Sequence, residues 1–562
     1  MNKKVHFATI LLLFFGFLAT AQTIVWTGAA SDNNFFTEGN WKDSITNVIP
    51  TAGSINPATN INLVLQINSS ATTITAAGII QIGTGSLAVG SADLTAQGFS
   101  GGSVTINDGG YVSLSNGTPL ANSVQVNFTS GIGWVKTTSY DASAISTNNL
   151  SQLKVNGSAA IYQTNLRLDH YYLTGCVIRA NLASATPLTI YDGINKLGNS
   201  AGITVNTIHI GNAIAGSMNN KIKSFVLKKG FMATLAINED GTGKSKNYIA
   251  SEADLTVNTL DVALRNSISF IRVMPWNWVT KKGRTDYETD LNSTWVYKWG
   301  NSQSTTLDWE YVPMQWGNLA SIPPSASVIN NYVNKYNSTH LLTFNEPDSC
   351  DGQSGQYPGG PTVNKLCNPD VSVKHYKELL KTGMRMVSPA TREGGYRTTD
   401  WLYEFIAKAK AQDLRIDAIA VHWYDWGSNP VGTPNASAAA IFARFQDYII
   451  DLENAFNLPI WITEFNANPA RSNATNAAFM ALALPWLEGR SSVERYAWFP
   501  YNVGTHYYGW DEALNNGEGG QTNTTPTAVG TQFGNQVSTP SIPETTVNAA
   551  NNLTLTTCTN CN

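Results

Sequence analysis

The sequence predicts a multidomain protein in which an N-terminal all-β domain, of the parallel β-helix or solenoid class, precedes a (β/α)8 TIM barrel. Three observations support this. First, 562 residues are too many for one ordinary hydrophobic core. Second, the first half is rich in Gly, Asn, Ser and Thr and repeats short pairs of β-branched residues. Third, the second half alternates apolar runs with helix-like segments and holds thirteen of the sixteen tryptophans.

Residues 1–21 have the pattern of a signal peptide. Two lysines precede an apolar run at residues 7–18, and an A-x-A cleavage site follows this run. The run is too short to span a bilayer, which needs ~20 apolar residues. We therefore expect cleavage near Ala21-Gln22 and a protein that is secreted or held at the cell surface. No second stretch is long and apolar enough for an integral membrane span.

Residues 22–255 read as a β-rich repeat domain. Apolar pairs separated by Gly and Asn clusters indicate strands joined by turns. The pairs recur every 20 to 29 residues, a period typical of a solenoid whose turns stack their strands. A β-sandwich carbohydrate-binding module is the alternative. This domain would either bind carbohydrate or act as a spacer. The pairs are Ile80/Ile82, Val104/Ile106, Val124/Val126, Leu153/Val155, Val177/Ile178, Ile203/Val205 and Phe225/Leu227.

Residues 256–535 show strand-then-helix repetition, which predicts a parallel sheet. Eight such units in about 280 residues predict a TIM barrel. The tail at 536–562 is rich in Thr and Asn, and we expect it to be flexible. The eight candidate strands lie at 268–278, 293–300, 309–316, 340–347, 384–390, 416–424, 458–465 and 495–502.

Aromatic and polar residues gather where these strands end. The active site of a TIM barrel lies at the C-terminal ends of its strands, and indoles there offer flat faces for stacking on sugar rings. We therefore expect a carbohydrate cleft. The candidate substrate-binding residues are Asn345, His422, Tyr424, Trp276, Trp299, Gln315, Trp316, Trp423 and Trp498.

Two glutamates end strands of the same barrel and are 118 residues apart, Glu346 after the fourth strand and Glu464 on the seventh. Glycoside hydrolysis needs two carboxyl groups that flank the scissile bond. Each glutamate also has a plainer interpretation, a turn residue for Glu346 and a salt-bridged barrel residue for Glu464. Their joint position favours catalysis.

Five short motifs, VPMQWG, TFNEPD, VSPA, AVHWY and PIWITEF, occur in this order and resemble glycoside hydrolase family 128, a clan A retaining family whose known members are β-1,3-glucanases. The resemblance covers roughly residues 260–535. It implies that Glu346 is the acid/base, that Glu464 is the nucleophile, and that Asn345 binds the 2-hydroxyl of the sugar. His422, Tyr424 and the rim tryptophans would line the subsites.

The chemistry agrees with that assignment. Glu464 would attack the anomeric carbon while Glu346 protonates the leaving oxygen, and Glu346 would then activate water. The sequence thus predicts a secreted retaining endo-β-1,3-glucanase. Two alternatives stay open: a retaining hydrolase of another neutral β-linked polysaccharide, and a non-catalytic carbohydrate-binding or adhesin-like protein.

Cys350 and Cys367 flank a Gly/Pro-rich loop just after Glu346. In an exported protein, a disulfide between them would close this loop beside the strand end. Such a long loop departs from the simplest pattern of the family, so it bears on substrate linkage more than on the reaction.

Composition excludes several other classes of function. The net charge of −4 and the lack of any Lys/Arg run argue against nucleic acid as a partner. The seven histidines are dispersed and no H-E-x-x-H motif occurs, so we expect no metal and no cofactor. No G-x-S-x-G elbow is present. We expect a monomer that acts on a polysaccharide.

Overall fold

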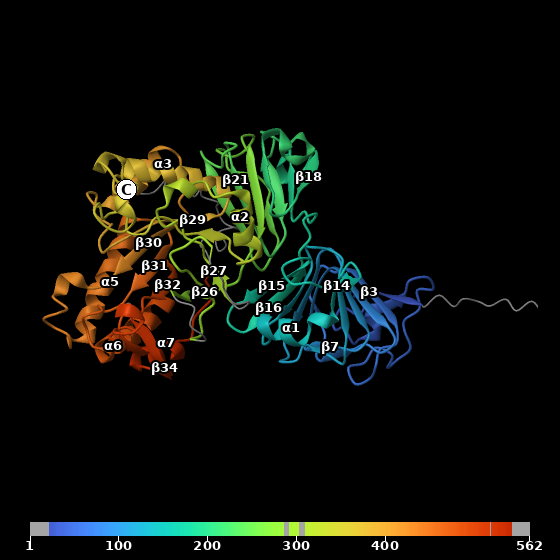
Figure 1. Ribbon diagram of the computed structural model, residues 1–562. Coiled ribbons are helices and arrows are strands. Elements are labelled where there is room, and N and C mark those ends of the chain that lie inside the picture. The colour runs from blue at the N-terminus through green and yellow to red at the C-terminus, as the bar shows by residue number, and fades with distance from the viewer. Residues whose placement is uncertain (1–21, 286–290, 303–308, 518, 542–562) are drawn as a thin grey trace, which may run out of the picture.

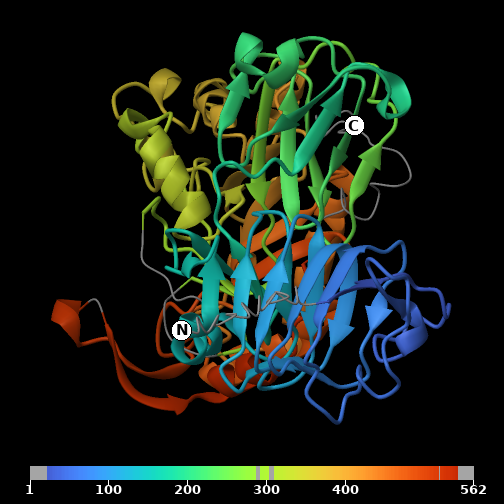
Figure 2. The ribbon, with the colours of Figure 1, turned by 90° about the vertical axis from the view of Figure 1, so that its right-hand side faces the viewer.

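The computed structural model describes residues 22–285, 291–302, 309–517 and 519–541. The predicted signal peptide at 1–21 and the predicted tail from 542 onward lie outside these residues. Three parts follow one another along the described chain (Figure 1): a coil of parallel strands, an antiparallel sandwich, and a ring of parallel strands surrounded by helices. Figure 2 shows the sandwich standing above the coil, with the ring behind both.

The first part is a three-sided coil of parallel strands. Strands β3, β6, β8, β11 and β13 pair in parallel on one side, β4, β6, β9 and β12 on the second, and β5, β7 and β10 on the third. Leu65, Leu87, Val104 and Val126 lie opposite one another along the first side and are buried. We propose that this region is a parallel β-solenoid. Its elements are β1 (Thr23–Trp26), β2 (Trp41–Asp43), β3 (Val64–Ser69), β4 (Ile74–Thr75), β5 (Ile79–Gln81), β6 (Ser86–Ala96), β7 (Gly98–Ser100), β8 (Ser103–Ile106), β9 (Gly110–Leu114), β10 (Leu120–Ala121), β11 (Gln125–Phe128), β12 (Trp134–Thr137), α1 (Ala142–Asn148), β13 (Leu153–Val155), β14 (Ser158–Ala159), β15 (Leu166–Tyr171) and β16 (Gly175–Ala180).

The sequence predicts one repeat domain that continues to residue 255, but the parallel coil ends before that residue. The pairings made by β14, by the hairpin β15–β16 and by every later strand up to β24 are antiparallel. The pairs Ile203/Val205 and Phe225/Leu227 therefore belong to another architecture. Short apolar pairs between turns are compatible with either direction of pairing, and their spacing does not distinguish the two.

The second part is a sandwich of two four-stranded antiparallel sheets, ordered β18-β17-β20-β23 and β19-β24-β21-β22. The rings of Phe225 and Tyr248 pack edge to face between the sheets, with their centroids 4.8 Å apart. Residues 268–278 were predicted as the first barrel strand, but they supply β24, which pairs with β19 and β21. The boundary with the third part therefore lies near residue 276. The strands are β17 (Leu188–Tyr191), β18 (Ser200–Ile203), β19 (Ile208–Ile210), β20 (Ser224–Leu227), β21 (Phe231–Ala236), β22 (Ser245–Ala250), β23 (Leu255–Val257) and β24 (Phe270–Pro275).

The third part is an eight-stranded sheet of parallel strands, ordered β27-β26-β25-β32-β31-β30-β29-β28. A parallel bridge between Met314 and Leu342 joins the two ends of this order, and the amide of Gln315 donates to the carbonyl of Leu342 at 2.9 Å. We propose that the closed ring is a (β/α)8 barrel. Its elements are β25 (Lys282–Arg284), β26 (Trp295–Val296), β27 (Glu310–Tyr311), α2 (Ala326–Asn334), β28 (His340–Leu341), α3 (Pro369–Leu379), β29 (Arg385–Thr391), α4 (Trp401–Ala411), β30 (Ala418–Trp423), α5 (Ala438–Ala455), β31 (Ile460–Phe465), α6 (Asn473–Glu488), β32 (Val493–Trp498), β33 (Tyr508–Asp511), β34 (Gly520–Pro526) and α7 (Ala528–Asn535).

Residues 536–541, which the sequence analysis placed in the tail, pack against the start of the ring. The amide of Lys281 donates to the carbonyl of Thr539 at 2.9 Å, and the amide of Ser541 donates to the carbonyl of Val279 at 2.8 Å. Among the described residues, no helix has the length and apolar character that a membrane crossing requires.

Buried ion pairs fill the N-terminal end of the ring. Arg385 pairs with Glu494, Arg495 pairs with Glu310 at 2.7 Å, and His340 lies between these pairs. Burial lowers the pKa of His340 to about 4, and the Arg495 charge adds to this. Because ion pairs fill this end of the ring, a ligand has room only at the opposite end, where the strands have their C-termini.

Candidate active site

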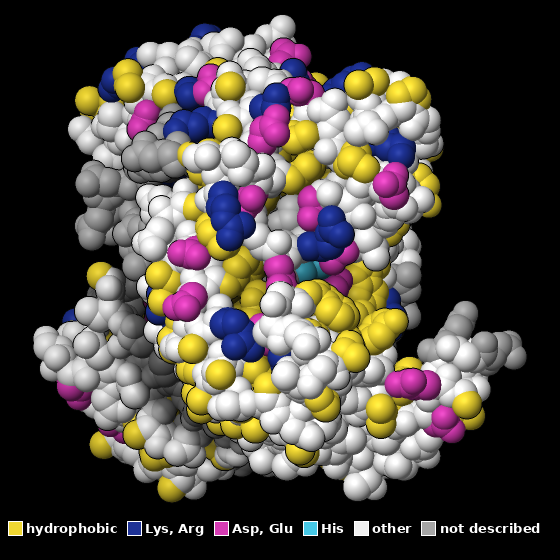
Figure 3. Space-filling view, turned by 90° about the vertical axis from the view of Figure 1, so that its left-hand side faces the viewer, with side chains coloured by type: hydrophobic (Ala, Val, Ile, Leu, Met, Phe, Trp, Pro, Cys, Tyr) yellow, Lys and Arg dark blue, Asp and Glu magenta, His cyan; other side chains and the backbone are white. Residues whose placement is uncertain are grey.

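A cleft of about 570 Å³ opens at the C-terminal ends of the ring strands. Figure 3 shows this face: acidic side chains and a histidine lie in a hollow, with hydrophobic side chains along one side. The residues that line the cleft are Trp299, Trp316, Asn345, Glu346, Gln353, Tyr424, Trp426, Glu464, Pro469, Phe499 and Tyr501.

Glu346 reaches the cleft because the chain turns sharply just after β28. Asn345 forms a parallel bridge with Ala390 of β29, and the amide of Glu346 donates to the carbonyl of Ala390 at 2.7 Å. The φ angle of Glu346 is +45°, in the left-handed region that few residues other than glycine adopt. Backbone strain of this kind is concentrated at functional sites. Here it directs the carboxylate into the cleft.

Glu464 extends from β31, and three aromatic side chains donate hydrogen bonds to its carboxylate. The indole N–H of Trp299 lies 2.7 Å from Oε1, the hydroxyl of Tyr297 lies 3.3 Å from the same oxygen, and the hydroxyl of Tyr424 bonds to Oε2. Burial, and then the charge of Glu464, hold the pKa of each tyrosine well above its usual range. Both hydroxyls therefore stay protonated and donate, which orients an ionised carboxylate.

His422, on β30, lies between the two glutamates. Its Nδ1 is 2.9 Å from Oε1 of Glu346, and its Nε2 is 3.5 Å from Oε1 of Glu464. Burial alone would lower the pKa of this imidazole, but the nearby Glu464 and Glu346 carboxylates outweigh burial and raise the pKa. The ring therefore favours the cationic form, which can donate to both carboxylates.

One carboxylate oxygen of Glu346, one of Glu464 and a ring nitrogen of His422 all lie within 4.8 Å of one another. This upper limit for one oxygen of each carboxylate is compatible with the ~5–5.5 Å separation of the carboxyl groups in retaining glycosidases. The same three groups could enclose a metal ion. A metal would bind the neutral imidazole, whereas the two carboxylates raise the pKa of His422.

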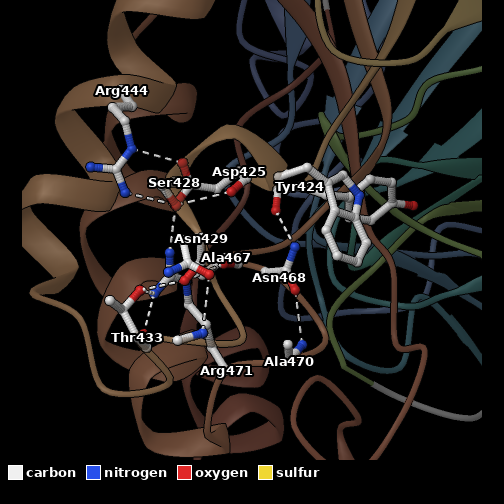
Figure 4. Close-up of polar contacts among 12 residues, drawn as sticks. Tyr424, Asp425, Ser428, Asn429, Thr433, Arg444, Ala467, Asn468, Ala470 and Arg471 are labelled. Atoms are coloured by element: carbon white, nitrogen blue, oxygen red, sulfur yellow. Dashed lines mark hydrogen bonds and ion pairs between the residues drawn. The ribbon is translucent and has the colours of Figure 1, made fainter.

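Figure 4 shows how the loop after β30 fixes Tyr424. The carbonyl of Tyr424 accepts from the amide group of Asn468 at 2.7 Å. The next residue, Asp425, is buried and accepts from Arg444 at 2.7 Å and from Arg471 at 2.9 Å. From the other side, the Glu393 carboxylate accepts from the amide of Tyr424 at 2.6 Å. These contacts hold the tyrosine that bonds to Glu464.

The structure brings most of the predicted site residues together. Glu346 and Glu464 face each other, and Asn345, Trp299, Trp316 and Tyr424 line the same cleft. His422 lies beneath them, between the two carboxylates.

Besides the buried His422, four predicted substrate-binding residues do not line the cleft. Trp276 packs against His340 at the opposite end of the ring, with ring centroids 5.7 Å apart. Trp423 and Trp498 are buried against Phe479 of α6, Trp423 with its ring stacked and Trp498 with its ring tilted. Gln315 is 2% exposed and donates to the carbonyl of Asn318 at 2.9 Å, which braces the loop after β27.

Strand alternation explains two of these corrections. Successive residues of a strand point to opposite faces, so the residue next to an inward one points outward. Ala497 belongs to the cluster inside the ring, Trp498 therefore faces the helices, and Phe499 faces the cleft. His422 and Trp423 divide in the same way. Trp276 was misplaced because its segment belongs to the sandwich.

Five residues that line the cleft were not among the predicted site residues: Gln353, Trp426, Pro469, Phe499 and Tyr501. Trp426 and Tyr501 follow strand ends by a few residues, and the same aromatic signal could have found them. Gln353 had no such signal. It lies in the loop that a disulfide between Cys350 and Cys367 closes.

Comparisons with known proteins point to the third part of the chain. Residues 274–529 match the family model described as the glycosyl hydrolase catalytic core. Alkali-sensitive linkage protein 1 of Schizosaccharomyces pombe is 30% identical over 242 residues, which are 42% of this chain and 39% of that protein. This chain therefore spans about two fifths of the length of that curated relative.

Two similar solved structures are those of glycoside hydrolase family 128 proteins. One is a variant of a subgroup I endo-β-1,3-glucanase from Amycolatopsis mediterranei in complex with laminarihexaose, 28% identical, covering 45% of this chain and 98% of that chain with a TM-score of 0.36. The other is a subgroup III curdlan-specific exo-β-1,3-glucanase from Blastomyces gilchristii, 24% identical, covering 46% and 98% with a TM-score of 0.31. The match of the family model makes residues 274–529 similar to the glycosyl hydrolase catalytic core family.

Proposed function

We propose that this chain is an exported, retaining endo-β-1,3-glucanase. One observation carries the proposal: carboxylate oxygens of Glu346 and Glu464 lie within 4.8 Å, joined by His422, in an aromatic cleft. A water molecule between the sugar and a general base, as inversion requires, needs carboxyl groups ~6.5–9.5 Å apart. The shorter distance supports direct attack by one carboxylate.

The two glutamates differ in ways that support separate roles. Glu464 accepts hydrogen bonds from Trp299, Tyr297 and Tyr424, which orient its carboxylate in the cleft as a nucleophile requires. Glu346 has one such partner, His422. A proton on Glu346 can pass to the leaving oxygen, and the resulting carboxylate can then take a proton from water. Glu346 is therefore the acid/base in this proposal.

The shape of the cleft supports a neutral polysaccharide as substrate. The aromatic faces come from Trp299, Trp316, Trp426, Phe499 and Tyr501, and no Lys or Arg among the described residues lines the cleft. Trp426 is 56% exposed and Tyr501 61% exposed, so both can stack on sugar rings at the rim. A cleft open along its rim suits internal cleavage of a long chain. The choice of β-1,3-glucan follows the motifs that resemble family 128.

The direct test is hydrolysis of a soluble laminarin-type β-1,3-glucan, with release of oligosaccharides of several lengths. Glu464→Gln should lower kcat by at least about 10³-fold, because no covalent intermediate forms. Glu404→Gln changes an exposed glutamate on α4 and should leave kcat unchanged. Undiminished turnover by Glu464→Gln would refute the nucleophile assignment.

The alternatives predict different results in the same assay. Activity on another neutral β-glycan alone would keep the reaction and change the substrate. Tight glucan binding by the wild-type protein, without any hydrolysis, would favour the non-catalytic binding protein.

A further inference from the structure

The disulfide-closed loop, residues 350–367, forms part of the cleft wall next to the acid/base. The amide of Ser354 donates to the carbonyl of Asn345 at 3.1 Å. A Cβ added to Gly355 would lie 2.1 Å from the carbonyl oxygen of Ser349, and one added to Gly317 would lie 2.6 Å from Cβ of Ser354. The loop is therefore wedged between the segment that carries Glu346 and the segment that follows Trp316. Its position is tied to the catalytic residues.

Gln353 occupies a backbone conformation that normally requires glycine. Its φ and ψ angles are 45° and −150°. A side chain in such a region destabilises the fold, and residues held there cluster at ligand-binding sites. Gln353 is nevertheless exposed, and its side chain packs into no core that would explain it. The strain therefore has no structural benefit among the described contacts.

The side chain of Gln353 faces Asn345 across the cleft floor. Nδ2 of Asn345 lies 3.4 Å from Oε1 of Gln353, and both residues line the cleft beside Glu346. Oδ1 of Asn345 is buried and has no hydrogen-bond partner among the described residues. A buried acceptor without a partner carries a free-energy cost that a ligand hydroxyl would remove.

We propose that Gln353 binds a hydroxyl group of a neutral sugar ring beside Asn345, and that the disulfide-closed loop thus builds one binding position of the cleft. The inference rests on the proposed function, because it assigns a ligand to the same cleft. A carboxamide both donates to and accepts from a hydroxyl without adding charge, which suits an uncharged polysaccharide. Trp316, whose ring lies 5.7 Å from that of Tyr357 in this loop, offers the adjacent stacking face.

Two substitutions separate binding from folding. Gln353→Ala removes the amide but keeps a Cβ in the strained backbone, whereas Gln353→Gly removes both. We expect both variants to raise KM for a β-1,3-linked oligosaccharide about three- to tenfold, with kcat within about twofold of wild type. Only Gln353→Gly should also raise the melting temperature, by about 1–3 °C, because it relieves the strain.

Asp351→Ala is the matched control, because Asp351 lies in the same loop with a fully exposed side chain. It should change neither KM nor melting temperature. Both Gln353 variants keeping the wild-type KM, in a protein that hydrolyses the glucan, would overturn this inference and leave the proposed function intact. An equal rise in KM for Asp351→Ala would also overturn it, since the effect would belong to the loop in general.

A wild-type protein without hydrolytic activity would instead overturn the proposed function. Gln353 would then be tested by calorimetric binding of laminarihexaose. A threefold or greater loss of affinity in both Gln353 variants would support the inference. Equal affinity in wild type and variants would overturn it.

Discussion

His422 couples the two residues on which the proposed chemistry depends. Its imidazole bonds to Glu346 at 2.9 Å and approaches Glu464 at 3.5 Å, and it is completely buried. A cation here lowers the cost of placing two carboxylates within 4.8 Å of each other. His422, which the resemblance assigned to substrate binding, is buried beneath the cleft and holds the two glutamates of the proposed mechanism together.

The raised pKa of His422 predicts how stability depends on pH. The imidazolium contributes fully to the free energy of unfolding below the unfolded-state pKa of about 6.5, and this contribution is lost as pH rises through the raised folded-state pKa. His422→Gln removes it. The stability advantage of wild type over the variant should therefore shrink between about pH 6 and pH 9. Urea unfolding across this range measures the advantage, and an advantage that grows with pH would contradict the raised pKa.

At the scale of elements, strand periodicity predicted most of the ring and misplaced its beginning. Seven of the eight strands that we predicted overlap β26 to β32. The first strand, β25, has the sequence Lys-Gly-Arg and therefore no apolar pattern. Its Lys282 is buried and donates to the carbonyls of Phe533 and Gln536 at 2.8 and 2.6 Å. Tertiary contacts far along the chain make this polar strand possible, and a local pattern does not contain them.

The same limit applies to the cleft. Glu346, Glu464 and Tyr424 were predictable because each ends a strong apolar strand. Gln353 was not, because its position follows from the disulfide and from close packing at Gly317 and Gly355. The coil-to-sandwich change was missed because apolar pairs of similar spacing occur in both parts.

At the scale of the whole molecule, the sandwich forms the base of the ring. Arg272 of β24 donates to the carbonyl of Thr382, Thr234 donates to the carbonyl of Gly383 at 2.6 Å, and Arg415 donates to Asn247 at 2.7 Å. All these groups are buried, and one hydrophobic cluster runs through both parts. The N-terminal region is therefore more than a spacer joined to an independent barrel.

These contacts predict the effect of truncation. A chain lacking residues 23–250 loses the strands that pair with β24, and Arg415 and the carbonyl of Gly383 lose their buried partners Asn247 and Thr234. We expect that chain not to unfold cooperatively and to lack activity. A chain lacking residues 23–182 keeps the whole sandwich but loses the buried hydrogen bonds of Arg167 to Val333 and of Arg179 to Trp276. It should be less stable than the full chain and still hydrolyse soluble oligosaccharides. Calorimetry and the glucan assay test both chains. If the chain lacking residues 23–250 were stable and fully active, the domain boundary would lie near residue 255, as the sequence predicts.

The stereochemistry of the first product tests the central claim most directly. Carboxylate oxygens of Glu346 and Glu464 that lie within 4.8 Å of each other suit the two displacements of the proposed mechanism, which would retain the anomeric configuration. Proton NMR of a β-1,3-glucan oligosaccharide, recorded in the first minutes of hydrolysis, should show the β anomer of the new reducing end before mutarotation produces the α anomer. Appearance of the α anomer first would contradict the account.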